Sequence, residues 1–165
     1  MQTLQIDQRQ TFIQMALKAW NIHVNRLDKL FDSLSDEALL YEVAPDRNRV
    51  VYLIGHLVAS NDTMVGLFGL GQRKYANLDE AFLKNPDKST LAMPEPAALR
   101  KIWKESNAEL TAYFSKMLPD DWFSKHTAMT EEDFEKEPGR NKLSVLINRT
   151  NHMAYHLGQL VLVKI

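Results

Sequence analysis

Helical periodicity is the feature of this sequence that most limits its fold. In four long segments, apolar residues recur at spacings of three and four and so fall on one face of an α-helix. The segments cover about residues 7–34, 48–70, 96–118 and 141–164. Clusters of Pro, Gly, Asn and Asp separate them, and no long run shows the alternation typical of β-strands. The sequence therefore predicts an all-α protein.

Glycine and proline residues mark several helix boundaries. Gly69-Leu-Gly71 is expected to end the second helix, because glycine commonly terminates helices. Pro96 suits the first turn of the third helix, and Pro119 is expected to stop it. A short additional turn is predicted over residues 35–40.

The second and third helices are joined by a long polar connection, residues 71–95. Connections of this length in a compact domain are commonly functional or cross from one end of the fold to the other. We therefore expect a four-helix bundle with a long crossover connection between helices 2 and 3. Bundles of this kind build metal sites from side chains on facing helices.

Length and charge set further limits. The chain has 165 residues, of which 45% are hydrophobic, so we expect one domain over residues 1–165 with a substantial core. Lys and Arg number 20 against 21 Asp and Glu, giving a net charge of −1. Such a balance provides no global attraction to nucleic acid or to an anionic membrane, and neither is expected as a partner.

The chain contains no cysteine. This absence excludes disulfides, cysteine-ligated zinc and a cysteine nucleophile, so any thiol chemistry would require a thiol from a cosubstrate. The N-terminal residues lack the pattern of a secretory signal, and no apolar run is expected to reach the roughly 20 residues of a membrane span. The sequence predicts a soluble, cytoplasmic protein.

Two histidines one helical turn apart, His152 and His156, are the main candidate site. Side chains at i and i+4 lie on the same helix face and can bind one metal ion. His56 lies in the second helical segment and, like the pair, at the margin of an apolar face. Neutral imidazole binds divalent transition metals, and three histidine ligands would leave positions open, as in catalytic sites. The pair alone is also compatible with ordinary core histidines.

Other polar residues are weaker candidates. Asn148, Asn151 and Gln159 lie on the adjoining side of the last helix, where they could orient ligands or contact a substrate. His23 falls on the apolar face of the first helix and is interpreted as a hydrogen-bonded core histidine, with a catalytic role as the alternative. His126 is expected in an exposed loop.

Two motifs resemble a known family. The second helical segment contains Gly55-His56-Leu57, and the last contains His152-x-x-x-His156 followed by Leu-Gly-Gln159. In these motifs, and along the chain from the first helix to Gln159, the sequence resembles the DinB/YfiT-like superfamily of four-helix bundles. The resemblance implies a divalent metal, such as zinc, nickel, iron, manganese or cobalt, bound by His56, His152 and His156. It also implies a homodimer.

Characterised relatives in this superfamily include metal-dependent transferases and isomerases that use low-molecular-weight thiols such as bacillithiol, mycothiol or glutathione. The resemblance therefore predicts a thiol S-transferase that acts on a small electrophilic substrate. A hydrolase using metal-bound water is an alternative, because the same site could ionise water. A non-catalytic, dimeric stress-response or binding module is a second alternative, and a helical bundle with core histidines is a third.

Overall fold

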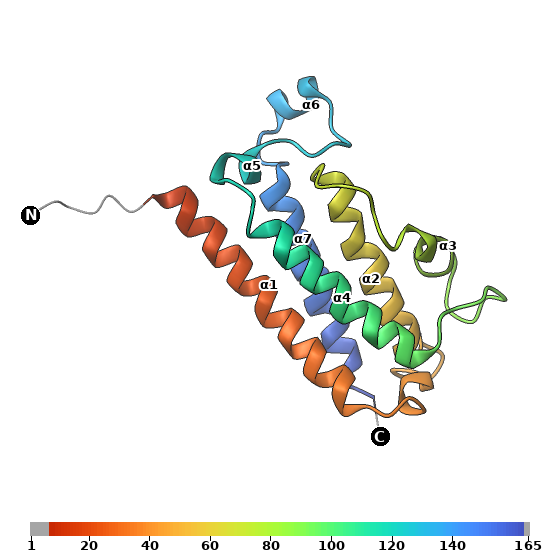
Figure 1. The fold of residues 1–165 in the computed structure, drawn as a ribbon. Helices are drawn as coiled ribbons and strands as arrows, with labels where there is room; N and C mark the ends of the chain where they lie inside the picture. The colour runs from red at the N-terminus through yellow and green to blue at the C-terminus, as the bar shows by residue number, and fades with distance from the viewer. Residues whose placement is uncertain (1–6, 164–165) are drawn as a thin grey trace, which may run out of the picture.

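The computed structural model describes residues 7–163, and the regular structure of this part of the chain is helical (Figure 1). The four long helices are α1 (Gln8–Ser33), α2 (Val50–Leu67), α4 (Pro96–Phe114) and α7 (Lys142–Leu160). The predicted all-α four-helix bundle is confirmed. A short 3-10 turn, η1 (Ala38–Leu40), follows α1 where an additional turn was expected.

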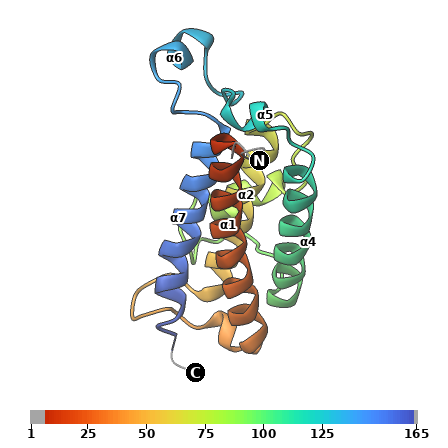
Figure 2. The ribbon, with the colours of Figure 1, turned by 90° about the vertical axis from the view of Figure 1, so that its left-hand side faces the viewer.

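The four long helices form two parallel pairs. Helix α1 packs against α7 and α4, and α2 packs against the same two helices, so α1 and α2 occupy opposite corners. Figures 1 and 2 show α1 and α7 running in one direction and α2 and α4 in the other. Helix α7 therefore lies antiparallel beside α2.

Local capping explains several helix ends. The Asp7 side chain accepts hydrogen bonds from the backbone N–H groups of Arg9 and Gln10 at the start of α1. Asn141 caps α7 by accepting from the Ser144 N–H at 3.0 Å. After α2, Gly69 adopts a φ of 69°, and its N–H and that of the next residue bond to carbonyls of the last helical turn. A glycine tolerates this left-handed conformation, which explains why the helix ends there.

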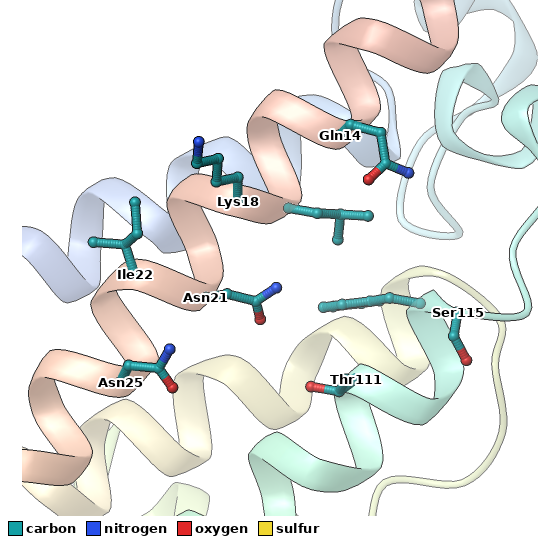
Figure 3. A pocket seen from close by; sticks show the side chains of 9 residues that line it. Gln14, Lys18, Asn21, Ile22, Asn25, Thr111 and Ser115 are labelled. Carbon is teal, nitrogen blue, oxygen red and sulfur yellow. The ribbon is translucent and has the colours of Figure 1, made fainter.

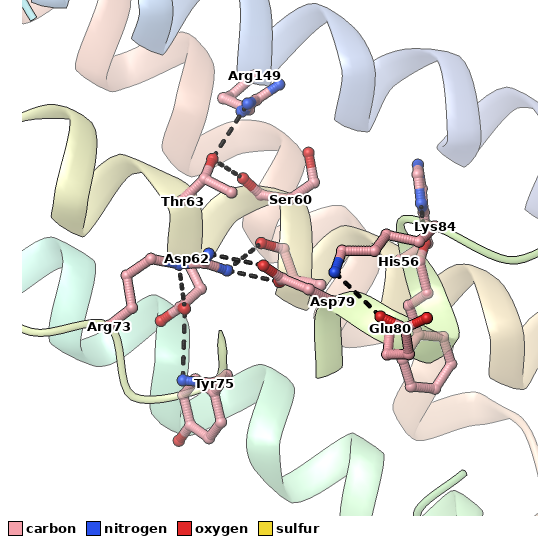
Figure 4. Close-up of polar contacts among 12 residues, drawn as sticks. His56, Ser60, Asp62, Thr63, Arg73, Tyr75, Asp79, Glu80, Lys84 and Arg149 are labelled. Atoms are coloured by element: carbon pink, nitrogen blue, oxygen red, sulfur yellow. Dashed lines mark hydrogen bonds and ion pairs between the residues drawn. The ribbon is translucent and has the colours of Figure 1, made fainter. Parts of the chain in front are cut away.

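The connection after α2 returns along the side of that helix. Arg73 forms an ion pair with Asp62 at 3.0 Å, near the end of α2 (Figure 4). Further along the connection, Asp87 pairs with Arg49, the residue that precedes α2, at 2.6 Å. Helices α2 and α4 therefore begin at the same end of the bundle. Between these two ion pairs lie η2 (Ala76–Leu78) and α3 (Asp79–Phe82).

Some helix boundaries differ from the sequence-based prediction. Helix α4 ends at Phe114 rather than at residue 118, and Pro119 begins α5 (Pro119–Phe123). The residue before a proline is restricted to extended backbone, and Leu118 has a ψ of 157°, so the chain leaves α4 before reaching Pro119. Helix α6 (Glu131–Lys136) follows, and α7 ends at Leu160, whereas the expected end at residue 164 lies outside the described residues.

Helix α2 is the central core helix. Fourteen of its residues are buried, including a run of six from Val50 to Gly55. Contrary to the expectation from the sequence, α2 is long and apolar enough to cross a membrane by length and composition alone. However, 78% of this stretch is buried inside the bundle, as in the core helix of a soluble domain.

Candidate metal site

Three histidines from two antiparallel helices meet where α2 packs against α7. The Nε2 atom of His152 lies 3.0 Å from Nε2 of His56 and 2.9 Å from Nε2 of His156. One ring nitrogen from each residue lies within 4.8 Å of the other two. His156 is buried, and the other two rings are partly buried. The structure thus brings together the three residues that the sequence and the family resemblance indicated.

Hydrogen bonds at the far side of two rings fix their protonation. The Nδ1 atom of His56 lies 2.8 Å from the backbone carbonyl of Phe82, and Nδ1 of His156 lies 2.7 Å from Oε1 of Gln159. Gln159 is itself oriented, because its Nε2 donates to the Tyr155 hydroxyl at 3.2 Å. A carbonyl oxygen only accepts, so each Nδ1 must carry the proton. In the neutral rings, Nε2 of His56 and His156 therefore presents a lone pair.

These lone pairs converge on the third ring. A single proton on Nε2 of His152 could satisfy one of its two neighbours but not both. A divalent cation could be coordinated by the lone pairs of all three nitrogens. Nitrogens bound to one ion at about 2.1 Å lie about 3.0–3.4 Å apart. The observed spacings of 2.9 and 3.0 Å are close to this range. The three histidines therefore have the donor chemistry and the spacing to hold a metal ion.

Burial favours the uncharged rings that metal binding needs. Burial, followed by the nearby rings of His156 and His56 and the charge of Arg149, lowers the pKa of His152 to about 4. Burial also lowers the pKa of His156, against the effect of its hydrogen bond with Gln159. Both rings are therefore neutral at pH 7, which is the ligand form of histidine.

The glycine before His56 allows the Phe82 carbonyl to reach the site. A methyl group on Gly55 would lie within 2.5 Å of three ring carbons of Phe82, because the phenyl ring packs directly on the backbone of α2. Phe82 is fully buried in this position. The Gly55-His56 motif therefore has a steric explanation, since the glycine admits the residue whose carbonyl orients the histidine.

Comparison with known proteins agrees with this geometry. The sequence model of the DinB superfamily matches residues 19–160, which include all three histidines. The chain belongs to the DinB superfamily. A search of curated proteins finds no match to the sequence.

The other candidates of this DinB-superfamily protein have different positions. Gln159 contacts His156, as described above, whereas Asn148 and Asn151 are exposed on α7 and form no hydrogen bond with the histidines in the described structure. His23 is partly buried on α1 outside the cluster, and its Nδ1 lacks a hydrogen-bond partner among the described residues, contrary to the expected hydrogen-bonded core histidine. His126 is partly buried rather than exposed.

Sequence reasoning missed three neighbours of the site. They are the Phe82 carbonyl, the Ser60 hydroxyl, which lies 3.4 Å from Nδ1 of His152, and Arg149, one turn before His152. A carbonyl group has no side-chain signature, but Tyr75, Leu78 and Phe82 recur at helical spacing inside the supposedly polar connection. That periodicity could have shown that the segment packs on the core.

Two surface hollows are lined by none of the three histidines. A groove of about 400 Å³ runs between α1 and α4, lined in part by Gln14, Asn21 and Thr111 (Figure 3). A smaller pocket of about 190 Å³ is lined by residues 43 and 46–48 and by Gln159. Since Gln159 contacts both this pocket and His156, only the smaller of these two hollows adjoins the candidate site.

Proposed function

We propose that this DinB-superfamily protein is a divalent-metal-dependent enzyme whose metal ligands are His56, His152 and His156. The observation that carries the proposal is that the Nε2 atoms of His56 and His156 lie 3.0 and 2.9 Å from Nε2 of His152, and that hydrogen bonds at Nδ1 fix both as acceptors. Three protein ligands leave coordination positions for a substrate, which is the pattern of catalytic rather than structural sites.

The reaction we propose is transfer of a small thiol to an electrophilic substrate. The chain has no cysteine, so the sulfur must come from a low-molecular-weight thiol cosubstrate. When bound, the metal ion would lower the pKa of that thiol, so that the thiolate is available at neutral pH. A carbon–sulfur bond then forms as the bond to the leaving group breaks, and the thiol proton passes to solvent. A cytoplasmic location would suit this reaction, because small thiols stay reduced there.

Residues of the chain orient and surround the reacting groups. The Phe82 carbonyl and Gln159 hold two histidine rings with Nε2 directed at the shared centre. The exposed amides of Asn148 and Asn151 lie within one helical turn of His152, and we propose that they contact the substrate. The pocket beside Gln159 would admit a small molecule to the same end of the site.

Metal content tests the site directly. Wild-type protein purified without chelators should contain about one divalent metal ion per chain, measured by elemental analysis. His152→Ala should lose it, whereas the matched control His126→Ala, a histidine outside the cluster, should retain it. A wild-type protein without stoichiometric metal, or unchanged metal in His152→Ala, would contradict the proposal.

Turnover separates the reaction classes. Metal-loaded protein should convert a chromogenic electrophile only when a small thiol is present, and His56→Ala should abolish that turnover. Metal-dependent turnover of an ester without any thiol would instead favour the hydrolase. No turnover with a panel of thiols and electrophiles would favour a non-catalytic binding module.

We also propose that two copies of the chain associate through α1. Phe12, Met15 and Ile22 recur along one side of α1 and are 59%, 62% and 40% exposed. Such an apolar stripe on a surface helix is typical of an interface. Light scattering should show a dimer that Met15→Glu converts to a monomer, whereas Lys101→Glu, a charge change at an exposed residue of α4, should leave it intact. A monomeric wild-type protein would refute this assignment.

A further inference from the structure

Arg149 is distinguished from the other partly buried arginines by its lack of a carboxylate partner. Arg49, Arg73 and Arg100 are also partly buried, and each forms an ion pair with an aspartate at 2.6–3.0 Å. Arg149 has no carboxylate within 4.0 Å among the side chains of residues 7–163, a range that contains every Asp and Glu of the sequence. A partly buried charge without a partner is costly, so this guanidinium is suited to an anion from outside the chain.

The hydrogen bonds of Arg149 leave much of its donor capacity unused. Its Nη2 donates to the Thr63 hydroxyl at 3.1 Å, which fixes the side chain against α2 (Figure 4). Its Nε is buried without an acceptor, and its Nη1 forms no hydrogen bond with the described residues. Burial accordingly lowers the pKa of Arg149. The side chain is therefore held in a fixed orientation, but some of its N–H groups have no hydrogen-bond acceptor among the described residues.

Arg149 lies beside the histidine cluster and is connected to it. It precedes His152 by one turn on the face of α7 that meets α2. The Thr63 hydroxyl that holds Arg149 donates to the Ser60 carbonyl at 2.6 Å, and the Ser60 hydroxyl lies 3.4 Å from Nδ1 of His152. Arg149 is therefore close enough for one small molecule to contact both the guanidinium and the metal centre.

We propose that Arg149 binds a carboxylate of the small molecule that occupies the three-histidine site. A planar guanidinium fork matches a single carboxylate, with which it can form two parallel hydrogen bonds. This inference rests on the proposed metal-dependent function and deepens it, because it assigns the substrate class as a carboxylate-bearing thiol or electrophile. Arg149 would act as a specificity-determining residue, while the histidines bind the metal.

Cobalt-substituted protein and matched thiols provide the test. Binding of each thiol would be measured from the change in the visible absorption of bound Co²⁺, during titration with 3-mercaptopropionate or with its uncharged analogue 3-mercaptopropan-1-ol. Wild-type protein should bind the carboxylate about 10- to 100-fold more tightly, the range expected for a hydrogen bond to a charged group. Arg149→Gln should remove this preference while keeping the affinity for Co²⁺ and for the alcohol within about twofold, and Arg149→Lys should retain part of it.

A matched control distinguishes local recognition from a general charge effect. Arg26→Gln removes an equal charge from an exposed arginine of α1 that does not line the pocket at Gln159, and it should leave the preference unchanged. Equal affinities of the two thiols for wild-type protein, an equal loss of both in Arg149→Gln, or loss of the preference in Arg26→Gln would overturn the assignment of Arg149. If Co²⁺ does not bind at all, the proposed metal-dependent function itself fails, which is a different result.

Discussion

Substitution of Gly55 by alanine is a sharp test of how the site is built. In most helices this change is stabilising by about 0.5–1 kcal/mol, because alanine loses less backbone entropy than glycine on folding. In α2 the added methyl group would lie within 2.5 Å of three carbons of the Phe82 ring. The structure therefore predicts the opposite sign at this position.

The size of the effect follows from the distances. Apolar carbons pack at about 3.5–4.0 Å, so the Phe82 ring must move by about 1 Å or more to accommodate the methyl group. Overpacking of this kind costs about 1–3 kcal/mol in the free energy of unfolding, or roughly 2–12 °C in Tm for a domain of this size. The same movement would extend the 2.8 Å contact between the Phe82 carbonyl and Nδ1 of His56 beyond hydrogen-bond range. Loss of such an orienting contact weakens metal affinity by about 10- to 100-fold.

Urea denaturation of metal-free protein and competitive zinc titration measure the two effects separately. Gly158→Ala is the matched control, since Gly158 lies within α7 and an added Cβ would meet no atom within 4 Å. That change should stabilise the protein by up to about 1 kcal/mol. Gly55→Ala should instead destabilise it and weaken zinc binding.

A double-mutant cycle with Phe82→Ala completes the test. Phe82→Ala alone should cost about 3–5 kcal/mol, because it opens a cavity in the core. In that background the clash is gone, and Gly55→Ala should become neutral or stabilising. Gly55→Ala with wild-type stability and zinc affinity, or an equal destabilisation in both backgrounds, would refute the steric explanation of the Gly55-His56 motif.

Three further predictions follow from the contacts. Gln159→Leu should weaken zinc affinity by about 10- to 100-fold in competitive titration, because Nδ1 of His156 loses its acceptor; unchanged affinity would contradict that role. Metal-free protein should lose about 1–2 kcal/mol of stability between pH 6.5 and pH 5, because the pKa of His152 is lowered to about 4 and the unfolded chain therefore binds the proton first. In urea titrations His152→Gln should reduce this loss, and a pH profile identical to that of wild type would argue against the role of His152. Arg73→Met should destabilise the protein by about 3 kcal/mol, because it leaves the Asp62 carboxylate, which is only 3% exposed, without its cation. A cost below about 0.5 kcal/mol, as measured for exposed ion pairs, would show that Asp62 finds another partner.

The long helices could be predicted from the sequence because each buries one continuous stripe of side chains. Ile13, Trp20, Leu27 and Phe31 illustrate this on α1, where residues at helical spacing are all buried. The histidine pair was predictable for the same reason, since i and i+4 share a face whatever surrounds the helix. The approach of His56 to that pair depends on how α2 and α7 pack. The position of His56 at the margin of an apolar face made the approach possible, and the family resemblance specified it.

The connection after α2 was harder to interpret because its buried residues are few and dispersed among charged ones. Tyr75, Leu78 and Phe82 are 6%, 3% and 0% exposed, although the surrounding composition is typical of a solvated loop. The charges themselves are also structural, since Arg73 binds Asp62 and Asp79 rather than solvent alone. Local composition cannot show these pairings, because they join residues that are separated along the chain.

This placement gives the connection a direct role in the site. The ion pairs of Arg73 and Asp87 attach it to α2 on either side of Phe82, and the Phe82 ring fits against Gly55 between them. The carbonyl that orients His56 is therefore held at three points, two electrostatic and one steric. Because a carbonyl is present at every residue, position rather than chemical identity makes this one functional. A change in the connection can thus alter metal affinity without touching any of the three histidines.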